Sequence, residues 1–154
     1  MGIENDIQQS CFRNEFQKMG INIIYTANWL NEKIAHILSN EDITQQQYNI
    51  LRILRGSECP LSTLKIRERM LDKMSDTSRI VDRLITKGLV EKNACLKDKR
   101  LVDITLTVKG LSLLEKLDQY NDQIDAFLKG VTEKDAQLIN LTLDKIRAAA
   151  EQQK

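Results

Sequence analysis

The sequence predicts a mainly α-helical fold that carries one small β-hairpin. A single proline and six glycines among 154 residues argue against a fold with many turns and for long helices. Apolar residues recur at helical spacing along stretches near both ends of the chain, as on one face of a helix. One short stretch after residue 100 alternates with a period of two, which is typical of a strand.

The first long helix is predicted over residues 12–39. Its apolar stripe consists of Phe16, Met19, Ile23, Ala27, Leu30, Ile34 and Ile37. Tyr25 and Trp29 lie on a neighbouring face, so we expect this helix to contact two different partners. A stripe wider than one contact needs a second partner, and another copy of the chain would supply it.

The middle of the chain predicts three shorter helices. A capping box at residues 44–47 begins a helix that ends at Gly56. A short helix at 62–70 follows, then a tight turn, and then a helix at 75–87 with Ser75 as its N-cap. Two short helices joined by a tight turn predict a helix-turn-helix.

A β-hairpin is predicted directly after these helices. Its strands are residues 89–95 and 101–106, and its polar tip is residues 96–100. Because two strands alone are marginally stable, the hairpin must pack on the preceding helices. The arrangement is a winged helix-turn-helix.

Two more helices are predicted at the C-terminal end. One is capped by Thr107 and runs to about residue 129, and the last begins at a capping box at residues 132–135. We therefore expect a helical dimerisation region made of residues 1–40 and 107–154. Residues 41–106 would form a winged helix-turn-helix DNA-binding domain between them.

Plotted at about 100° per residue, the helix at 75–87 has a core-facing side and a polar side. The core-facing side consists of Thr77, Ile80, Val81 and Leu84. The polar side consists of Ser75, Asp76, Ser78, Arg79, Asp82, Arg83 and Thr86. Short polar side chains and an arginine near a helix start suit contact with base edges in the major groove of DNA. Because Asp82 would repel phosphate, we expect it to pair with Arg79.

The hairpin tip is basic. Its cations are Lys97, Lys99 and Arg100. They would fit the narrow minor groove of DNA or contact its phosphates, and Asp98 would hold Arg100 or Arg83 by an ion pair. Residues 60–110 carry twelve Lys and Arg against seven Asp and Glu, whereas the rest of the chain carries eleven against fifteen. A basic middle between acidic ends is typical of a nucleic-acid footprint.

Other classes of protein are disfavoured. No metal-ligand spacing, Gly-rich phosphate loop or paired acid–base constellation occurs, so we expect no enzyme activity, no cofactor and no metal. Three widely spaced cysteines without a C-x-x-C pair suit a reducing cytosol. No stretch has the length and hydropathy of a membrane span or a signal peptide. We expect a cytoplasmic protein without membrane contact.

Four segments together resemble the multiple-antibiotic-resistance regulator (MarR) family of bacterial winged-helix transcription regulators. They are residues 75–84 (SDTSRIVDRL), 87–90 (KGLV), 98–100 (DKR) and 104–110 (ITLTVKG). The flanking long helices agree with the family in length and order, so the resemblance covers nearly the whole chain. It implies a homodimer whose terminal helices intertwine and which binds a pseudo-palindromic operator in double-stranded DNA, usually as a repressor.

The resemblance also implies which parts of the winged domain contact DNA. The helix beginning at Ser75 would read the major groove, and Arg100 would enter the minor groove. At Lys99 the family usually has a second arginine, whose planar fork lysine lacks. The expected DNA contacts are Ser62, Ser75, Asp76, Thr77, Ser78, Arg79, Arg83, Lys97, Lys99 and Arg100.

Two kinds of switch and one alternative function stay open. Members of the family commonly respond to a small aromatic or anionic ligand bound between the dimer helices and the winged domain, where Tyr25 and Trp29 could line a cleft. Others sense oxidants through a cysteine near the start of the first helix, where Cys11 lies. The alternative is a winged-helix module that binds another protein, against which the basic middle and the wing argue.

Overall fold

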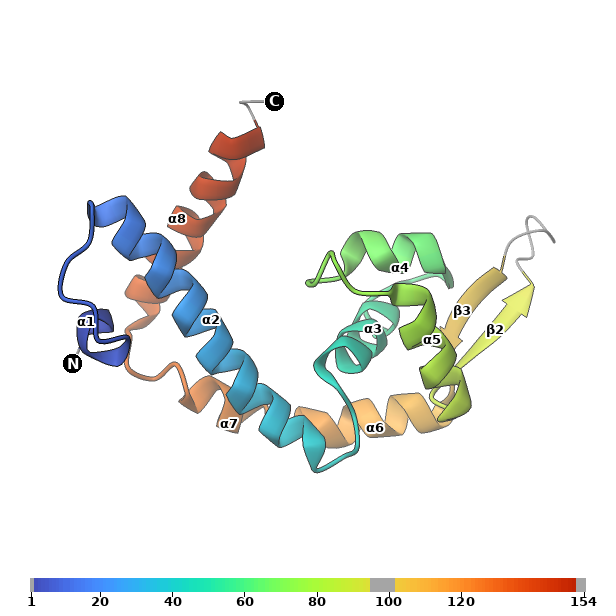
Figure 1. The fold of residues 1–154 in the computed structure, drawn as a ribbon. Helices are drawn as coiled ribbons and strands as arrows, with labels where there is room; N and C mark the ends of the chain where they lie inside the picture. The colour runs from blue at the N-terminus through green and yellow to red at the C-terminus, as the bar shows by residue number, and fades with distance from the viewer. Residues whose placement is uncertain (1, 95–101, 152–154) are drawn as a thin grey trace. The chain divides into compact units, whose positions relative to one another are not determined.

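A computed structural model describes residues 2–94 and 102–151 of the chain. The chain divides into two compact units between Tyr120 and Asn121, and each unit is described by itself. The elements in chain order (Figure 1) are α1 (Ile3–Asp6), α2 (Glu15–Ser39), α3 (Gln45–Arg55), β1 (Leu61–Ser62), α4 (Thr63–Arg69), α5 (Thr77–Thr86), β2 (Val90–Ala94), β3 (Val102–Leu106), α6 (Val108–Asp118), α7 (Asn121–Ala126) and α8 (Glu133–Glu151). The mainly helical fold with a small wing is confirmed.

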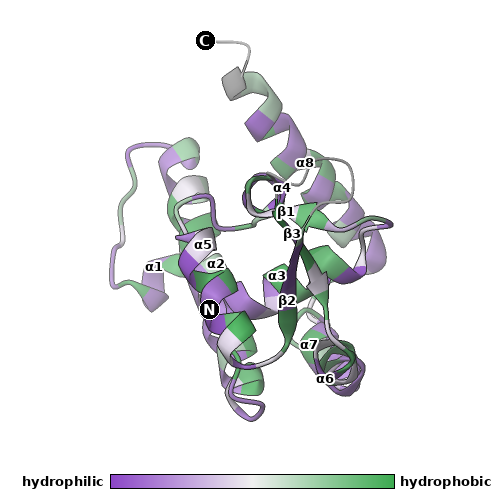
Figure 2. Cartoon of the chain, turned by 90° about the vertical axis from the view of Figure 1, so that its right-hand side faces the viewer, coloured by the Kyte–Doolittle hydropathy of each residue, from purple (hydrophilic) through white to green (hydrophobic). Residues whose placement is uncertain are grey.

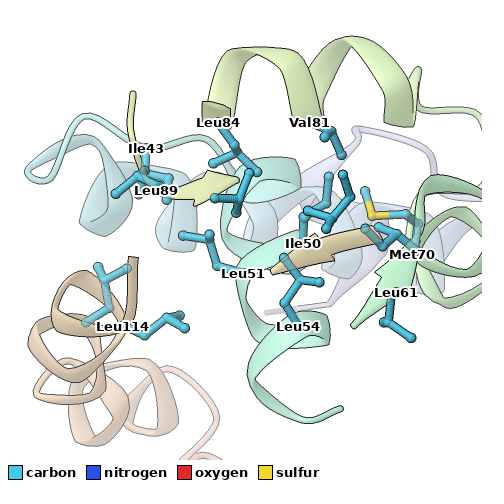
Figure 3. Packing of buried hydrophobic residues seen from close by; sticks show 14 of the residues in the cluster. Ile43, Ile50, Leu51, Leu54, Leu61, Met70, Val81, Leu84, Leu89 and Leu114 are labelled. Carbon is cyan, nitrogen blue, oxygen red and sulfur yellow. The ribbon is translucent and has the colours of Figure 1, made fainter. Parts of the chain in front are cut away.

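The hydrophobic core of the first unit draws side chains from every part of the winged helix (Figure 3). Its fully buried members include Ile50, Leu51, Ile66, Leu84, Ile104 and Leu114, which come from α3, α4, α5, β3 and α6. Leu38, at the end of α2, belongs to the same cluster. The core therefore joins the last turn of the first long helix to the helix-turn-helix and to α6.

The wing is a three-stranded antiparallel sheet in the order β1-β3-β2. The predicted hairpin is confirmed, with Val90 opposite Leu106 and Ala94 opposite Val102. Strand β1 was not predicted, because two residues are too short to show a period. Its Leu61 lies opposite Ile104, so β1 covers the second edge of β3 and fixes the wing to the start of α4.

Most predicted helix ends are confirmed. Thr44 and Gln47 form the capping box of α3, and Thr107 caps α6 by accepting a hydrogen bond from the Gly110 N–H. At α8, the Thr132 hydroxyl accepts from the Asp135 N–H, and the Asp135 carboxylate accepts from the Thr132 N–H. These caps were predictable because each is a hydrogen bond between a short polar side chain and a backbone group only three residues away.

Ser75 was predicted as the N-cap of the second short helix, and this was wrong. Asp76 is the N-cap of α5, and its carboxylate accepts the Arg79 N–H at 3.2 Å. The Ser75 hydroxyl instead donates to the Asp72 carbonyl at 2.8 Å and closes the preceding turn. Both residue types are good N-caps, so the choice depends on the conformation of that turn.

The second long helix, predicted from Thr107 to about residue 129, is interrupted. Helix α6 ends at Asp118, and the N–H groups of Gln119 and Tyr120 donate to carbonyls three residues earlier. The shorter hydrogen bonds tighten the last turn, and α7 begins at Asn121 as a separate helix. A second difference is α1, a short helix that was not predicted; the long helix α2 then begins at Glu15, after its N-cap Asn14.

An ion pair joins α3 to the end of α6. The Arg55 guanidinium donates to both carboxylate oxygens of Asp118, at 2.7 and 3.0 Å. This bidentate hydrogen bonding lowers the pKa of the Asp118 carboxyl below its ordinary value. A carboxyl whose pKa is lowered by folding contributes stability above its unfolded pKa, and the contribution is lost as the pH falls through the folded pKa.

We therefore expect Asp118→Asn to lower the free energy of unfolding at neutral pH by roughly 0.5–1 kcal/mol, the scale of a partly exposed pair. Urea unfolding at pH 7 and at pH 3 measures this effect. The difference between variant and wild type should shrink at the lower pH, because the stabilisation by the ionised carboxyl is lost progressively as the pH falls toward the folded pKa of Asp118. An equal difference at both pH values would contradict the assigned pair.

Candidate nucleic-acid interface

Helix α5 presents one side to the core and one to solvent, as predicted. Its buried residues are Thr77, Val81 and Leu84. Its exposed residues are Ser78, Arg79, Asp82, Arg83 and Thr86. The outward side is therefore entirely polar, with two arginines. In Figure 2 the winged unit is seen with α5, β2 and β3 labelled.

Thr77 corrects the expected set of DNA contacts. It is 3% exposed, and its side chain belongs to the core side of α5. Among the residues that the structure describes, its Oγ1 has no hydrogen-bond partner. A side chain this deeply buried cannot reach a base edge, so Thr77 serves the packing of α5.

The partner of Asp82 also differs from the prediction. Its carboxylate accepts from the ammonium of Lys92 on β2 at 2.9 Å, and the expected pair with Arg79 is not formed. The pair joins α5 to the base of the wing and neutralises the acid on the outward side. Both side chains are about half exposed, so the pair contributes little to stability. Arg79 and Arg83 are left as cations of this surface.

Ser62 begins α4 as its N-cap, where its hydroxyl accepts from the Lys65 N–H at 3.3 Å. Its backbone lies opposite Asp103 in the sheet, so the start of α4 lies beside the wing. The predicted wing-tip residues Lys97, Asp98, Lys99 and Arg100 lie outside the described residues.

Residues 43–102 match the model of the MarR family. The multiple antibiotic resistance protein MarR of Salmonella typhimurium is 27% identical over 136 residues, which cover 86% of this chain and 93% of that protein. A crystal structure of a cysteine-to-serine mutant of Escherichia coli MarR, complexed with operator DNA, has a TM-score of 0.78 and 26% identity. It covers 89% of this chain and 99% of that one. The chain is therefore similar to MarR-family proteins over most of its length.

A second DNA complex has the same fold. The MepR–DNA complex of Staphylococcus aureus has a TM-score of 0.72 and 20% identity, over 82% of this chain and 94% of that one. MarR-family proteins are transcription regulators, not enzymes, and this chain has their winged-helix fold. The predicted resemblance to the MarR family and the predicted fold class are confirmed.

Residues 106–110, which lie in one of the four segments that resemble the MarR family, have a structural role that the sequence did not reveal. The Thr107 hydroxyl donates to the Gly88 carbonyl at 2.7 Å, and the Lys109 ammonium donates to the Lys87 carbonyl at 2.8 Å. A Cβ on Gly110 would lie 2.1 Å from the Leu89 carbonyl oxygen. The segment therefore holds the C-terminal end of α5, where Gly88 turns the chain at a φ of +70°.

A cleft of about 700 Å³ lies between α2, α3 and the turn that follows α4. It is lined by Asn31 and Ala35 of α2, by Tyr48 and Arg52 of α3, and by Leu71, among others. The Arg52 guanidinium lies 5.6 Å from the centre of the Tyr48 ring. Tyr25 and Trp29, which were expected to line a ligand cleft, do not line this one.

The remaining sequence expectations concern the cysteines, metal ligands and membrane spans. Cys11 lies in the exposed segment between α1 and α2, and its thiol is free. No group of His, Cys, Asp and Glu in residues 2–94 and 102–151 is placed to hold a metal ion. In the same residues, no helix combines the length and hydropathy that crossing a membrane requires.

Proposed function

We propose that the chain is a DNA-binding transcription regulator that recognises duplex DNA with the outward side of α5. One observation supports this proposal most strongly. Ser78, Arg79 and Arg83 are exposed along α5, whose opposite side is buried in the core. A helix held in this way can enter a major groove without losing its packing. The E. coli MarR and S. aureus MepR complexes with DNA support the same use of the fold.

Arg79 is the residue assigned to base reading. It lies in the first turn of α5, and in the described part of the chain its guanidinium has no bonded acid, since Asp82 is paired with Lys92. A guanidinium can donate two parallel hydrogen bonds to O6 and N7 of guanine. Ser78 beside it is short, so the backbone can approach the bases closely.

The other contacts are assigned to the DNA backbone and the minor groove. Ser62 lies at the start of α4 beside the wing, and its hydroxyl can still donate to a phosphate. Arg83 would contact phosphate from the outward side of α5. The tip residues Lys97, Lys99 and Arg100 are assigned to the minor groove, with Asp98 orienting Arg100. Asp76 acts through its cap of α5, and the Ser75 hydroxyl proton is already donated to Asp72.

We also infer that the protein binds DNA as a homodimer. Two segments outside the winged core expose large apolar side chains. On α2, Phe16 is 77% exposed and Ile24 63%, and on α8, Leu138 is 64% exposed and Leu141 60%. Along α8, hydrophobic and hydrophilic residues alternate (Figure 2). Apolar surface of this extent in a single chain marks an interface, and a second copy of the same helices is its simplest partner.

We further propose that the protein represses transcription and that a small ligand releases it from the operator. The cleft between α2 and α3 is of the size that small ligands occupy, and Arg52 with Tyr48 offers a cation beside an aromatic ring. An aromatic or anionic ligand fits that chemistry. The residues that line the cleft include Leu71, in the turn that leads to α5, so a bound ligand would act on the reading helix through this turn.

The test is a selection of bound duplexes from a random pool with the purified full chain, followed by titration of the selected duplex at several salt concentrations. We expect a pseudo-palindromic consensus and an affinity whose log–log slope against salt is about −4 or steeper, since several phosphates are neutralised. Absence of duplex binding at low salt, together with a co-purifying protein, would contradict the proposal and favour the protein-interaction module.

The buried Thr77 gives a prediction on stability. Thr77→Val replaces an unbonded buried hydroxyl with a methyl group, so we expect the free energy of unfolding to rise by up to about 1 kcal/mol. The matched control is Thr107→Val, which removes the cap of α6 and should cost about 1 kcal/mol or more. Urea unfolding of both variants measures the difference. A loss of stability in Thr77→Val would mean that its hydroxyl has a partner.

A further inference from the structure

Two consecutive acidic residues that follow α2, Glu41 and Asp42, connect the end of that helix to α6 and α5. The Glu41 carboxylate accepts from the Lys116 ammonium at 2.7 Å and from the Tyr120 hydroxyl at 3.4 Å. Its side chain is only 11% exposed. Glu41 therefore ties the end of α2 to α6.

Asp42 makes the second connection, to α5. The Lys87 ammonium donates to the Asp42 carboxylate at 3.1 Å and also to the Asp42 backbone carbonyl. Asp42 has a φ of +50°, a left-handed conformation that aspartate tolerates better than most residues. In this conformation the backbone carbonyl oxygen of Asp42 and one of its carboxylate oxygens both accept from the Lys87 ammonium. Lys87 is the C-cap of α5, and its own carbonyl accepts from Lys109, so the end of α5 is held from two sides.

These ties have a consequence for a dimer that binds DNA. If α2 forms the dimer interface, as proposed above, the separation of the two α5 helices depends on the angle between α2 and α5 in each protomer. That separation must match the distance between the two halves of an operator. The core residues Leu38 and Ile43 hold the turn in place, but apolar contacts are not directional. The ion pairs of Asp42 with Lys87 and of Glu41 with Lys116 join specific atoms, so they favour one angle between α2 and α5.

We propose that the Asp42–Lys87 tie, assisted by Glu41–Lys116, sets the half-site spacing that the protein accepts. Lys87 and Lys116 are then positioning residues that need not touch DNA. The inference rests on the proposed DNA-binding homodimer and goes beyond it, because it assigns spacing selectivity to residues outside the DNA-contacting surface.

The variants isolate the tie from other effects. Lys87→Met removes the amine and keeps the apolar stem, whereas Lys87→Arg keeps a donor within reach of Asp42. Lys33→Met is the matched control, because Lys33 is an exposed cation of α2 that forms no ion pair with a described residue. A double variant, Lys87→Met with Lys116→Met, removes both ties. Asp42→Asn is the second route to the same loss from the other side of the pair.

The measurement is the affinity of each variant for the selected operator and for versions with one base pair added or removed between the half-sites. The spacing penalty is the affinity for the selected operator divided by the affinity for the version with altered spacing. We expect Lys87→Met to reduce the penalty about threefold and the double variant about tenfold, on the scale of ion pairs at the surface, since the Asp42 side chain is 99% exposed. Lys87→Arg and Lys33→Met should keep the wild-type penalty, and melting temperatures should agree within about 3 °C.

The outcomes separate this inference from the proposed function. A wild-type penalty in folded Lys87→Met and Asp42→Asn would overturn the spacing role while leaving DNA binding intact. A wild-type chain that selects no duplex would overturn both. Reduced affinity for every spacing with an unchanged ratio would also overturn the inference, because it would indicate a direct contact with phosphate.

Discussion

Replacing Gly110 with alanine is expected to lower the free energy of unfolding by about 3 kcal/mol or more, a large part of the roughly 5–15 kcal/mol by which a native domain is stable. Gly110 lies in the first turn of α6, which crosses directly over the strand entering the wing. The added Cβ would lie 2.1 Å from the Leu89 carbonyl oxygen and 3.1 Å from its carbon. Both are backbone atoms, so no side-chain rotation relieves the clash, and α6 would have to move off the core.

The loss should reach the DNA-contacting surface as well. The Leu89 N–H donates to Leu84 at the end of α5, and the Leu89 carbonyl accepts from Thr107. Displacing this segment therefore frees the C-terminal end of α5. Gly130→Ala is the control, since an added Cβ there meets nothing within 4 Å. Circular dichroism during urea titration measures both variants, and a Gly110→Ala protein as stable as the control would contradict the close approach.

The second large effect is expected from charge on α8. Leu138→Glu combined with Leu141→Glu places two carboxylates on its exposed apolar face. We expect a monomer by sedimentation and an operator affinity about 100-fold weaker or more, because a single winged unit loses the gain from binding two half-sites at once. The first unit should melt unchanged, since its core does not include α8.

The control adds the same charges elsewhere on that helix. Gln137→Glu combined with Asn140→Glu has the same spacing, and both residues are exposed and polar in the wild type. This variant should stay dimeric and should lose affinity only through its added negative charge. If the Leu138 and Leu141 double variant remained a dimer with full operator affinity, α8 would not belong to the interface.

Much of the fold follows from short-range patterns in the sequence. The apolar stripe of α2, the capping residues Thr44, Thr107 and Thr132, and the alternation in β3 each depend on residues within a few positions of one another. The outward polar side of α5 follows from its helical period. These features are local, so periodicity and capping chemistry identify them without knowledge of the tertiary structure.

The features that were missed depend on contacts between distant segments. Strand β1 exists because Leu61 meets Ile104, and α6 ends where Asp118 is bound by Arg55. Asp82 pairs with Lys92 across to the wing. The tie between Asp42 and Lys87 joins residues that are 45 positions apart. No periodic pattern encodes such pairs, because each depends on how two elements meet.

Arg79 is proposed to read a base in each half-site, and repeating the duplex selection with Arg79→Ala tests this role. We expect the variant to fold normally and to bind the wild-type consensus about 10- to 100-fold more weakly, the scale of one bidentate contact with guanine. It should also accept any base at one position in each half-site, while Thr77→Val selects the wild-type consensus. Selection of the same consensus at full affinity by Arg79→Ala would contradict the account.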